Sequence, residues 1–200
     1  MKDGHGFLFA TSTIAQKCGR DSASPAGCLI TVRARPGKPD QGLLSVEGRV
    51  FACALGRGGI GAMKREGDGA TPLAAMRPMG VFYRRERRHA ALAHTPLATR
   101  AIRADMGWCD APADANYNRP VRLPFRASHE RMLRDDTLYD VCVVLDWNVR
   151  PRRRGRGSAI FLHLARPGMA PTEGCIAVSL RTMARLLPLL SRHTRIVVRR

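Results

Sequence analysis

A histidine and a cysteine twelve positions apart are the pair of residues in this chain best suited to chemistry. His163 lies near the end of a predicted strand, Ser158–Leu164, and Cys175 opens the next predicted strand, Cys175–Val178. Residues 166–169, Arg-Pro-Gly-Met, can reverse the chain between them. If the two strands pair, imidazole and thiol meet at one rim of the sheet. A thiol is mostly protonated at neutral pH, so an imidazole that takes its proton makes it a nucleophile.

The residues just before the cysteine fit the same chemistry. Gly174 has no side chain, so a substrate carbonyl can approach the backbone there. The N–H groups of Gly174 and Cys175 are therefore candidates for an oxyanion hole. Thr172 is a candidate to orient a substrate or to support the turn. Spacing alone leaves open that His163 and Cys175 are packing residues without a catalytic role.

The segment from His163 to Ile176 resembles the catalytic motif of the YkuD-type L,D-transpeptidases. That motif has a histidine, a loop, and then Ser/Thr-x-Gly-Cys followed by an aliphatic residue, which residues 172–176, Thr-Glu-Gly-Cys-Ile, match in order. In two places the chain departs from the family pattern. Leu164 follows the histidine where the family commonly has Gly-Thr, and Ala177 stands where it commonly has Arg or Asn. These departures leave the exact bond formed open.

The resemblance implies a fold and a mechanism. The fold would be mostly β, a single sandwich or mixed-sheet domain with one or two short helices. The Cys175 thiolate would attack an amide carbonyl of a peptidoglycan stem peptide, His163 would move the proton, and an amine would resolve the thioester. Cross-links of 3→3 or 1→3 type are the favoured product. Hydrolysis as an L,D-carboxypeptidase and attachment of a protein to peptidoglycan are the alternatives. The resemblance also implies a periplasmic location, no cofactor or metal, and inhibition by carbapenem-type β-lactams.

Other residues are candidates for substrate binding. Tyr117, Asn118 and Arg119 could line a cleft, whereas Trp108 fits either a cleft wall or a core plug under a loop. Residues 56–72 are rich in glycine and charge, and they could form a solvated hairpin tip. Alternatively, Lys64 or Arg65 could bind a carboxylate of the stem peptide, because a positioned arginine suits bidentate contacts.

The composition leaves room for a different partner. With 34 Lys+Arg and 16 Asp+Glu among 200 residues, the net charge of +18 attracts polyanions such as nucleic acid, an anionic membrane or an acidic wall polymer. Arginine-rich coding alone could also produce this excess. The Arg150–Gly157 tract lacks interleaved aromatics, which favours a solvated turn over a nucleic-acid surface. A basic nucleic-acid-binding module and a wall-binding protein with an inactive dyad remain the alternative hypotheses.

The chain length and the cysteines limit the class of protein further. We expect one domain at residues 26–200 after a flexible arm at 1–25. None of the six cysteines forms a Cys-x-x-Cys pair, which argues against a zinc ribbon or a thioredoxin motif, although disulfides stay open. No apolar run is long enough to span a bilayer, and the apolar run near the N-terminus is too short for a secretory signal.

The remaining elements are predicted from hydrophobic pattern. Runs of apolar and β-branched residues predict further strands at Cys28–Arg35, Arg49–Leu55, Met79–Tyr83, Tyr139–Asp146 and Thr194–Val198, with turn residues between the first two. Ser179 is predicted to cap a helix whose apolar face carries Leu180, Met183, Ala184 and Leu187. The middle of the chain, 84–136, shows weak periodicity and is predicted to be a long loop.

Overall fold

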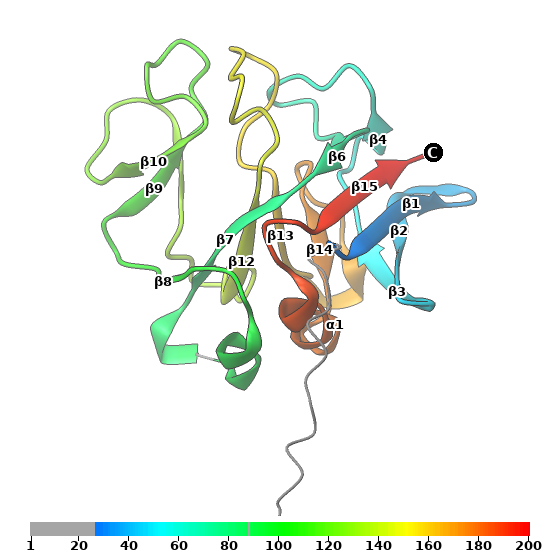
Figure 1. Ribbon diagram of the computed structural model, residues 1–200. Coiled ribbons are helices and arrows are strands. Elements are labelled where there is room, and N and C mark those ends of the chain that lie inside the picture. Colours follow the sequence, from blue (N-terminus) through cyan, green and yellow to red (C-terminus); the bar gives the residue numbers. More distant parts are fainter. Residues whose placement is uncertain (1–26, 88) are drawn as a thin grey trace, which may run out of the picture.

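One large mixed sheet forms the centre of the molecule (Figure 1). The computed structural model describes residues 27–87 and 89–200, so the arm predicted at 1–25 lies outside the described residues. The strand order is β6-β15-β1-β2-β3-β14-β13-β12-β7-β8. These strands are β1 Leu29–Arg35, β2 Lys38–Val46, β3 Arg49–Ala54, β6 Ala75–Met76, β7 Pro78–Tyr83, β8 Thr99–Ala101, β12 Val141–Leu145, β13 Phe161–Leu164, β14 Ile176–Val178 and β15 Arg195–Arg199. The predicted mostly β fold is confirmed.

The segment between the first two predicted strands is itself a strand. Turn residues were expected there, but β2 pairs antiparallel with both β1 and β3. Gly42 sits opposite Cys53, and a Cβ at Gly42 would lie 2.7 Å from the Cys53 sulfur. A glycine is therefore a packing requirement of this strand and not the sign of a turn.

The middle of the chain also carries regular structure, contrary to the predicted loop. It forms a second, three-stranded sheet in the order β10-β9-β11, with β9 buried along its whole length. Two 3-10 turns, η1 and η2, precede it. The bounds are β9 Met106–Cys109, β10 Arg119–Arg122, β11 His129–Arg131, η1 Arg85–Arg87 and η2 Ala90–His94. Strands of three or four residues are too short for periodicity to reveal them.

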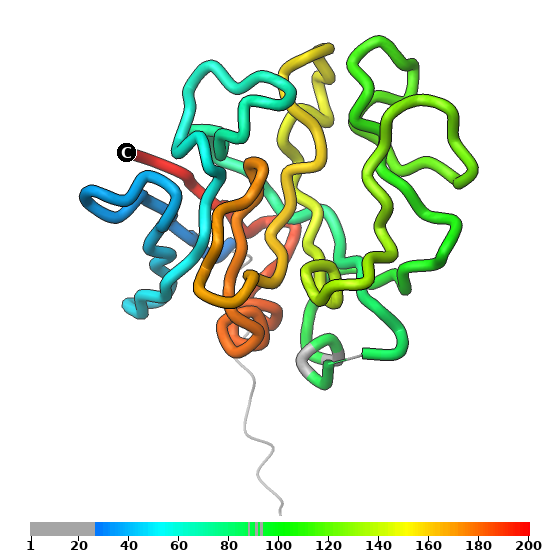
Figure 2. The backbone as a smooth tube through the Cα atoms, turned by 180° about the vertical axis from the view of Figure 1, so that it is seen from behind, coloured from blue at the N-terminus to red at the C-terminus, as the bar shows by residue number. Residues whose placement is uncertain are grey.

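The Gly-rich segment at 56–72 is also more ordered than a hairpin tip. Two short strands, β4 Ile60–Gly61 and β5 Thr71–Pro72, pair in parallel and form a two-stranded sheet of their own. In Figures 1 and 2 this segment (cyan), the residues after β12 (yellow) and the small-sheet region (green) all rise at the same end of the molecule.

A short helix covers one face of the large sheet. Helix α1, Leu180–Leu186, begins after Ser179, whose hydroxyl accepts a hydrogen bond from the Thr182 N–H at 3.1 Å. Met183 and Leu186 are fully buried against the sheet, although Leu180, predicted on the same apolar face, is 43% exposed. The 3-10 turn η4, Leu187–Leu189, continues α1 directly.

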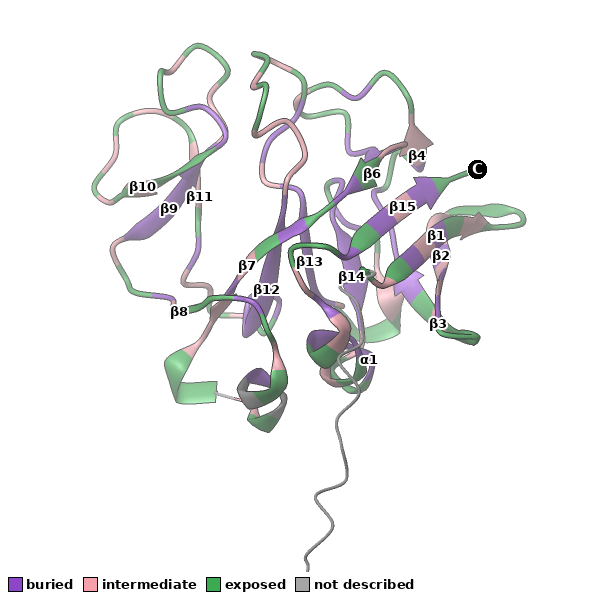
Figure 3. Ribbon diagram, viewed as in Figure 1, coloured by how far each residue is buried: buried purple, intermediate pink, exposed green. Residues whose placement is uncertain are grey.

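The two faces of the central strands lead to two cores. Along β12 and β13, Val141, Val143 and Leu162 point to the core under α1, while Cys142 and Phe161 point to a second core shared with the small sheet. In Figure 3 the central strands β12, β13 and β14 are purple because their residues are buried. Side chains alternate along a strand, so the residues at the positions of Phe161 and His163 face the small sheet. The candidate catalytic residues therefore lie between the large and the small sheet.

Candidate active site

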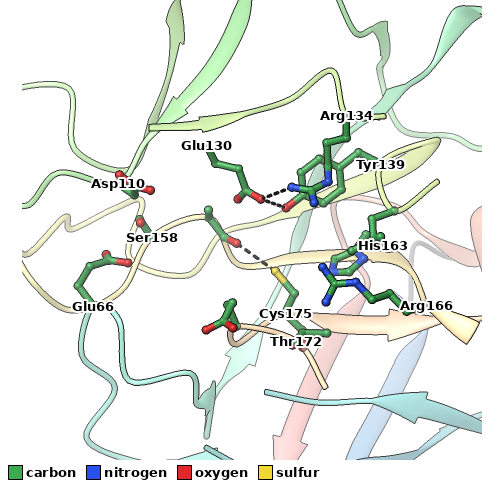
Figure 4. Close-up of a pocket in the computed structure, with 13 residues that line it drawn as sticks. Glu66, Asp110, Glu130, Arg134, Tyr139, Ser158, His163, Arg166, Thr172 and Cys175 are labelled. Atoms are coloured by element: carbon green, nitrogen blue, oxygen red, sulfur yellow. Dashed lines mark hydrogen bonds and ion pairs between the residues drawn. The ribbon is translucent and has the colours of Figure 1, made fainter. Parts of the chain in front are cut away.

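The pairing of β13 with β14 places the histidine and the cysteine on one face. The strands run parallel, with Leu162 opposite Ile176 and His163 opposite Ala177. Cys175 directly precedes β14, level with Phe161, so it shares a face with His163. The turn predicted at residues 166–169 forms as the 3-10 turn η3, Pro167–Met169, and the chain then crosses back before β14 begins parallel to β13. Figure 4 shows the imidazole and the thiol beside each other.

Two backbone groups hold the Cys175 thiol. Its sulfur donates to the Ala159 carbonyl at 3.2 Å and accepts from the Phe161 N–H at 3.3 Å. Ala159 has a φ of 51°, a left-handed conformation that is uncommon for a residue with a side chain. Burial raises the pKa of the Cys175 thiol to about 12. The sulfur is therefore oriented and protonated in the resting protein.

The imidazole of His163 is held in one tautomer. Its Nδ1 lies 2.8 Å from the Leu164 carbonyl oxygen, which can only accept, so Nδ1 carries the proton and Nε2 is left as an acceptor. Burial is the main cause that lowers the pKa of His163 to about 4, and the positive charges of Arg134 and Arg166 add to it. The ring is thus neutral at pH 7, and burial makes it a weaker base than a solvent-exposed imidazole.

A turn closed by Thr172 precedes the thiol. The Thr172 hydroxyl donates to the Cys175 carbonyl at 2.7 Å and accepts from the Gly174 N–H at 3.2 Å. Gly174 has a φ of 127°, and a Cβ there would lie 2.8 Å from the Ala70 carbonyl oxygen. Backbone conformation and the close approach of Ala70 thus require the glycine. The Gly174 N–H, expected to be free for an oxyanion, is paired with Thr172.

A cavity of about 450 Å³ opens over the thiol (Figure 4). Its charged side chains come from the small sheet and from the segments between strands. The lining consists of Glu66, Asp110, Glu130, Arg134, Leu138, Tyr139, Ser158, Ala159, His163, Arg166, Thr172, Glu173 and Cys175. The sequence reasoning found three of these, His163, Thr172 and Cys175, as site residues.

One wall of this cavity is a polar cluster that the sequence reasoning missed. Tyr139 donates its phenolic hydrogen to Glu130 at 2.7 Å, and Arg134 donates to the same carboxylate oxygen at 3.3 Å. Arg134 also forms a two-point contact with Asp136, at 2.9 and 2.8 Å. Burial raises the pKa of Glu130. The four-residue spacing of Glu130 and Arg134 was visible in the sequence, but nothing placed that segment beside Cys175.

Asn118, a predicted cleft residue, is instead a buried connector. Its side-chain oxygen accepts from the Trp108 indole N–H at 3.0 Å and from the Ala159 N–H at 3.1 Å. Its side-chain nitrogen donates to the carbonyls of Trp147 at 3.1 Å and Asn148 at 2.9 Å. Asn118 therefore fixes Ala159, whose carbonyl in turn receives the thiol hydrogen bond.

Trp108 is a core residue and does not line the cavity. Its ring packs edge-on against Phe161, with 5.2 Å between ring centroids. Of the two roles considered for it, the structure shows the core plug.

The other predicted binding residues also lie off the cavity wall. Tyr117 is buried and donates to Glu66, while Arg119 and Arg65 are exposed outside the lining. Lys64 is 3% exposed and is paired with Asp68, so it is neither a solvated tip residue nor available for a substrate carboxylate. The sequence alone does not indicate how far these side chains lie from the Cys175 thiol.

Three further observations concern metals, disulfides and membranes. Within residues 27–87 and 89–200 no group of three or more His, Cys, Asp or Glu side chains could hold a metal ion. The five cysteines of this part of the chain, Cys28, Cys53, Cys109, Cys142 and Cys175, are all free thiols. No helix in the described part is long and apolar enough to cross a membrane.

Comparison with known proteins gives one family. Residues 38–198 match the YkuD family, described as the L,D-transpeptidase catalytic domain. Similar solved structures include L,D-transpeptidase 1 of Mycobacterium tuberculosis, with 14% identity, a TM-score of 0.36 and coverage of 86% of this chain and 62% of that one. An L,D-transpeptidase from Mycobacterium smegmatis has 14% identity, a TM-score of 0.38 and coverage of 88% and 59%. The chain thus spans about three-fifths of these structures. No curated protein matches the sequence.

Proposed function

Because this chain belongs to the YkuD family of L,D-transpeptidase catalytic domains, we propose that it cross-links peptidoglycan stem peptides through a thioester on Cys175. The observation that carries the proposal is the state of the dyad. A neutral imidazole, whose Nε2 has no hydrogen-bond partner within the described residues, lies beside a neutral, oriented thiol in one cavity. We place the reaction in the periplasm, where its substrate is found, and it needs no metal or cofactor.

In the first half-reaction the thiol attacks an amide of the donor stem. His163 Nε2 takes the thiol proton, and the sulfur bonds to the carbonyl carbon. The Cys175 N–H stabilises the oxyanion, and the Gly174 N–H joins it once Thr172 releases it. The C–N bond then breaks, the leaving amine takes the proton from His163, and a thioester remains.

In the second half-reaction an amine of the acceptor stem attacks the thioester carbon. It passes a proton to His163, which returns it to the sulfur as the C–S bond breaks. The product is a new amide, the 3→3 or 1→3 cross-link. Water in place of the amine gives L,D-carboxypeptidase activity, and an amine carried by a protein attaches that protein to peptidoglycan.

Arg166 takes the place of Arg65 in the proposal as the group that binds a donor carboxylate. It lines the cavity on the side of His163 (Figure 4). Arg134 is already paired with Asp136 and Glu130, whereas Arg166 forms no ion pair within the described residues. A guanidinium without a partner beside the dyad is suited to the carboxylates of a stem peptide.

The test is product analysis with purified muropeptides. Wild type and Cys175→Ala are incubated with disaccharide tetrapeptides, and the products are followed by mass spectrometry. We expect dimers and a thioester adduct from the wild type and neither from the variant, with Cys142→Ala as the matched thiol control. A mass increase at Cys175 with a carbapenem would support the same nucleophile. Dimers from Cys175→Ala would overturn the proposal.

A further inference from the structure

The charge of the cavity is opposite to that of the whole protein. Basic side chains outnumber acidic ones by 34 to 16 in the chain. In the cavity the carboxylates are in the majority: Glu66, Asp110, Glu130 and Glu173, against the guanidinium groups of Arg134 and Arg166. An acidic cavity attracts cations, whereas the basic surface of the rest of the protein repels them.

Two of these carboxylates are already neutralised. Glu130 pairs with Arg134 at 3.3 Å, and Glu173 pairs with Arg57 at 2.7 Å. Glu66 and Asp110 form no ion pair within the described residues. Figure 4 shows both at the end of the cavity away from His163 and Arg166. The uncompensated negative charge is therefore concentrated at one end.

The same end holds buried acceptors without partners. Within the described residues Asp110 Oδ1 and the Ser158 hydroxyl are buried yet accept no hydrogen bond, and Ser158, 7% exposed, has its hydroxyl beside the phenol of Tyr117. One Glu66 oxygen, Oε2, accepts from Tyr117, while no hydrogen bond reaches Oε1 within the described residues. Buried polar groups are nearly always paired, so an unpaired set at a cavity wall indicates a ligand. A primary ammonium group has three N–H donors, which matches these three acceptors.

We propose that Glu66, Asp110 and Ser158 form a subsite for a primary ammonium group of a peptide ligand. The inference rests on the proposed function in one respect: the ammonium is assigned to the acceptor stem, and it passes one proton to the carboxylates that hold it before its free amine attacks the thioester. The two ends of the cavity then select by charge. The carboxylate of the donor lies toward Arg166, the ammonium of the acceptor lies toward Asp110, and Cys175 stands between them (Figure 4).

The first experiment measures binding without catalysis. The Cys175→Ala protein is titrated calorimetrically with Nα-acetyl-lysine methylamide and with its Nε-acetylated, uncharged form. We expect the ammonium probe to bind about tenfold more tightly, because charged hydrogen bonds are the strong ones. Adding Glu66→Gln and Asp110→Asn to the Cys175→Ala protein should weaken binding of the ammonium probe about tenfold. Adding Ser158→Ala alone should weaken it by a few-fold.

A charge-matched control uses carboxylates outside the cavity. Glu86 is paired with Arg84 and Asp105 with Arg103, both away from the cavity, so Glu86→Gln with Asp105→Asn removes two negative charges elsewhere. This control should bind the ammonium probe within about twofold of the parent, as screened surface charges act weakly. Equal binding of the two probes, or equal weakening by the control, would overturn the subsite. A melting curve shows that each variant is folded.

The second experiment separates this inference from the proposed function. Transfer to an amine acceptor is measured against hydrolysis of the thioester as the acceptor concentration rises. The Glu66→Gln/Asp110→Asn variant should need about tenfold more acceptor for half-maximal transfer. If Cys175 is acylated but this concentration stays unchanged, the subsite fails and the proposed function stands. If no acylation occurs while the calorimetric contrast persists, the proposed function fails and the ammonium site stands.

Discussion

The two walls of the cavity are held in place by different forces. On one wall, strand pairing sets the positions of His163 and Cys175, because the register between β13 and β14 fixes which backbone atoms are opposite each other. On the other wall, Asp110, Glu130 and Arg134 come from turns and very short strands. Side-chain hydrogen bonds and an ion pair hold Glu130 and Arg134 there. The reactive wall therefore depends on backbone, and the recognising wall depends on side chains that a single substitution can remove.

Asn118 connects the two walls. It belongs to the middle segment, yet it fixes Ala159, whose carbonyl orients the thiol. We therefore expect that a substitution at Asn118 disturbs the reactive wall as well.

The largest effect is expected at the reactive wall itself. His163→Gln should lower the rate of thioester formation about 10²–10⁴-fold, the usual contribution of a general base. Stability should change little by comparison. The matched control is His193→Gln on the exposed surface, which should leave the rate unchanged. If His163→Gln kept the wild-type rate, His163 would not be the general base.

Asn118→Ala should lower the free energy of unfolding by about 2–4 kcal/mol, because it leaves several buried donors and acceptors without partners. The rate of acylation of Cys175 should fall as well, since Ala159 loses its support. Urea unfolding and a carbapenem acylation assay would measure both. Asn116 is exposed two positions earlier, so Asn116→Ala is the control and should cost about 0.5 kcal/mol or less. If Asn118→Ala is destabilised but Cys175 is still acylated at the wild-type rate, Asn118 does not couple the two walls.

The pH dependence of stability tests the burial of His163. Its pKa falls from 6.5 in the unfolded chain to about 4 in the folded protein. The folded state thus binds fewer protons between these values, so stability is full above pH 6.5 and falls as the pH is lowered toward 4. The loss is about 3 kcal/mol at its limit. Chemical unfolding from pH 7 to 4 should show this slope in the wild type and a shallower one in His163→Gln.

The smallest effect is expected for binding of the donor carboxylate by Arg166. Arg166→Gln should raise KM for a muropeptide donor about tenfold with little change in kcat, as expected for a group that binds a carboxylate equally in ground and transition states. Arg152→Gln in the basic turn serves as the control and should keep KM within about twofold. A fall in kcat alone would assign Arg166 to the dyad instead.

The difference between the two walls also explains which features could be predicted from the sequence. Hydrophobic pattern located β12, β13, β14 and α1 within a few residues, and so it placed His163 and Cys175 at adjacent strand ends. It did not reveal that β13 and β14 run parallel, because pairing direction depends on the path of the connection. The recognising wall stayed hidden for a physical reason. Glu130 and Asp110 are brought to the thiol by tertiary packing of short segments that have no periodicity of their own.

Errors at individual residues have equally local causes. Tyr117 and Asn118 looked like cleft residues because polar aromatic and amide side chains often contact ligands. In the structure their hydrogen bonds are directed inward, to Glu66 and to Ala159. No sequence pattern signals the left-handed φ of Ala159, since alanine rarely adopts it.

The sheltered state of Cys175 has a consequence between turnovers. Oxidants and disulfides react with the thiolate, not with the thiol. Burial raises the pKa of the Cys175 thiol far above neutral pH, so the thiol form dominates, and the residue is only 8% exposed. Peroxide and small disulfides should therefore react very slowly with Cys175 while the cavity holds no substrate. A buried, protonated thiol of this kind can stay reduced in oxidising surroundings.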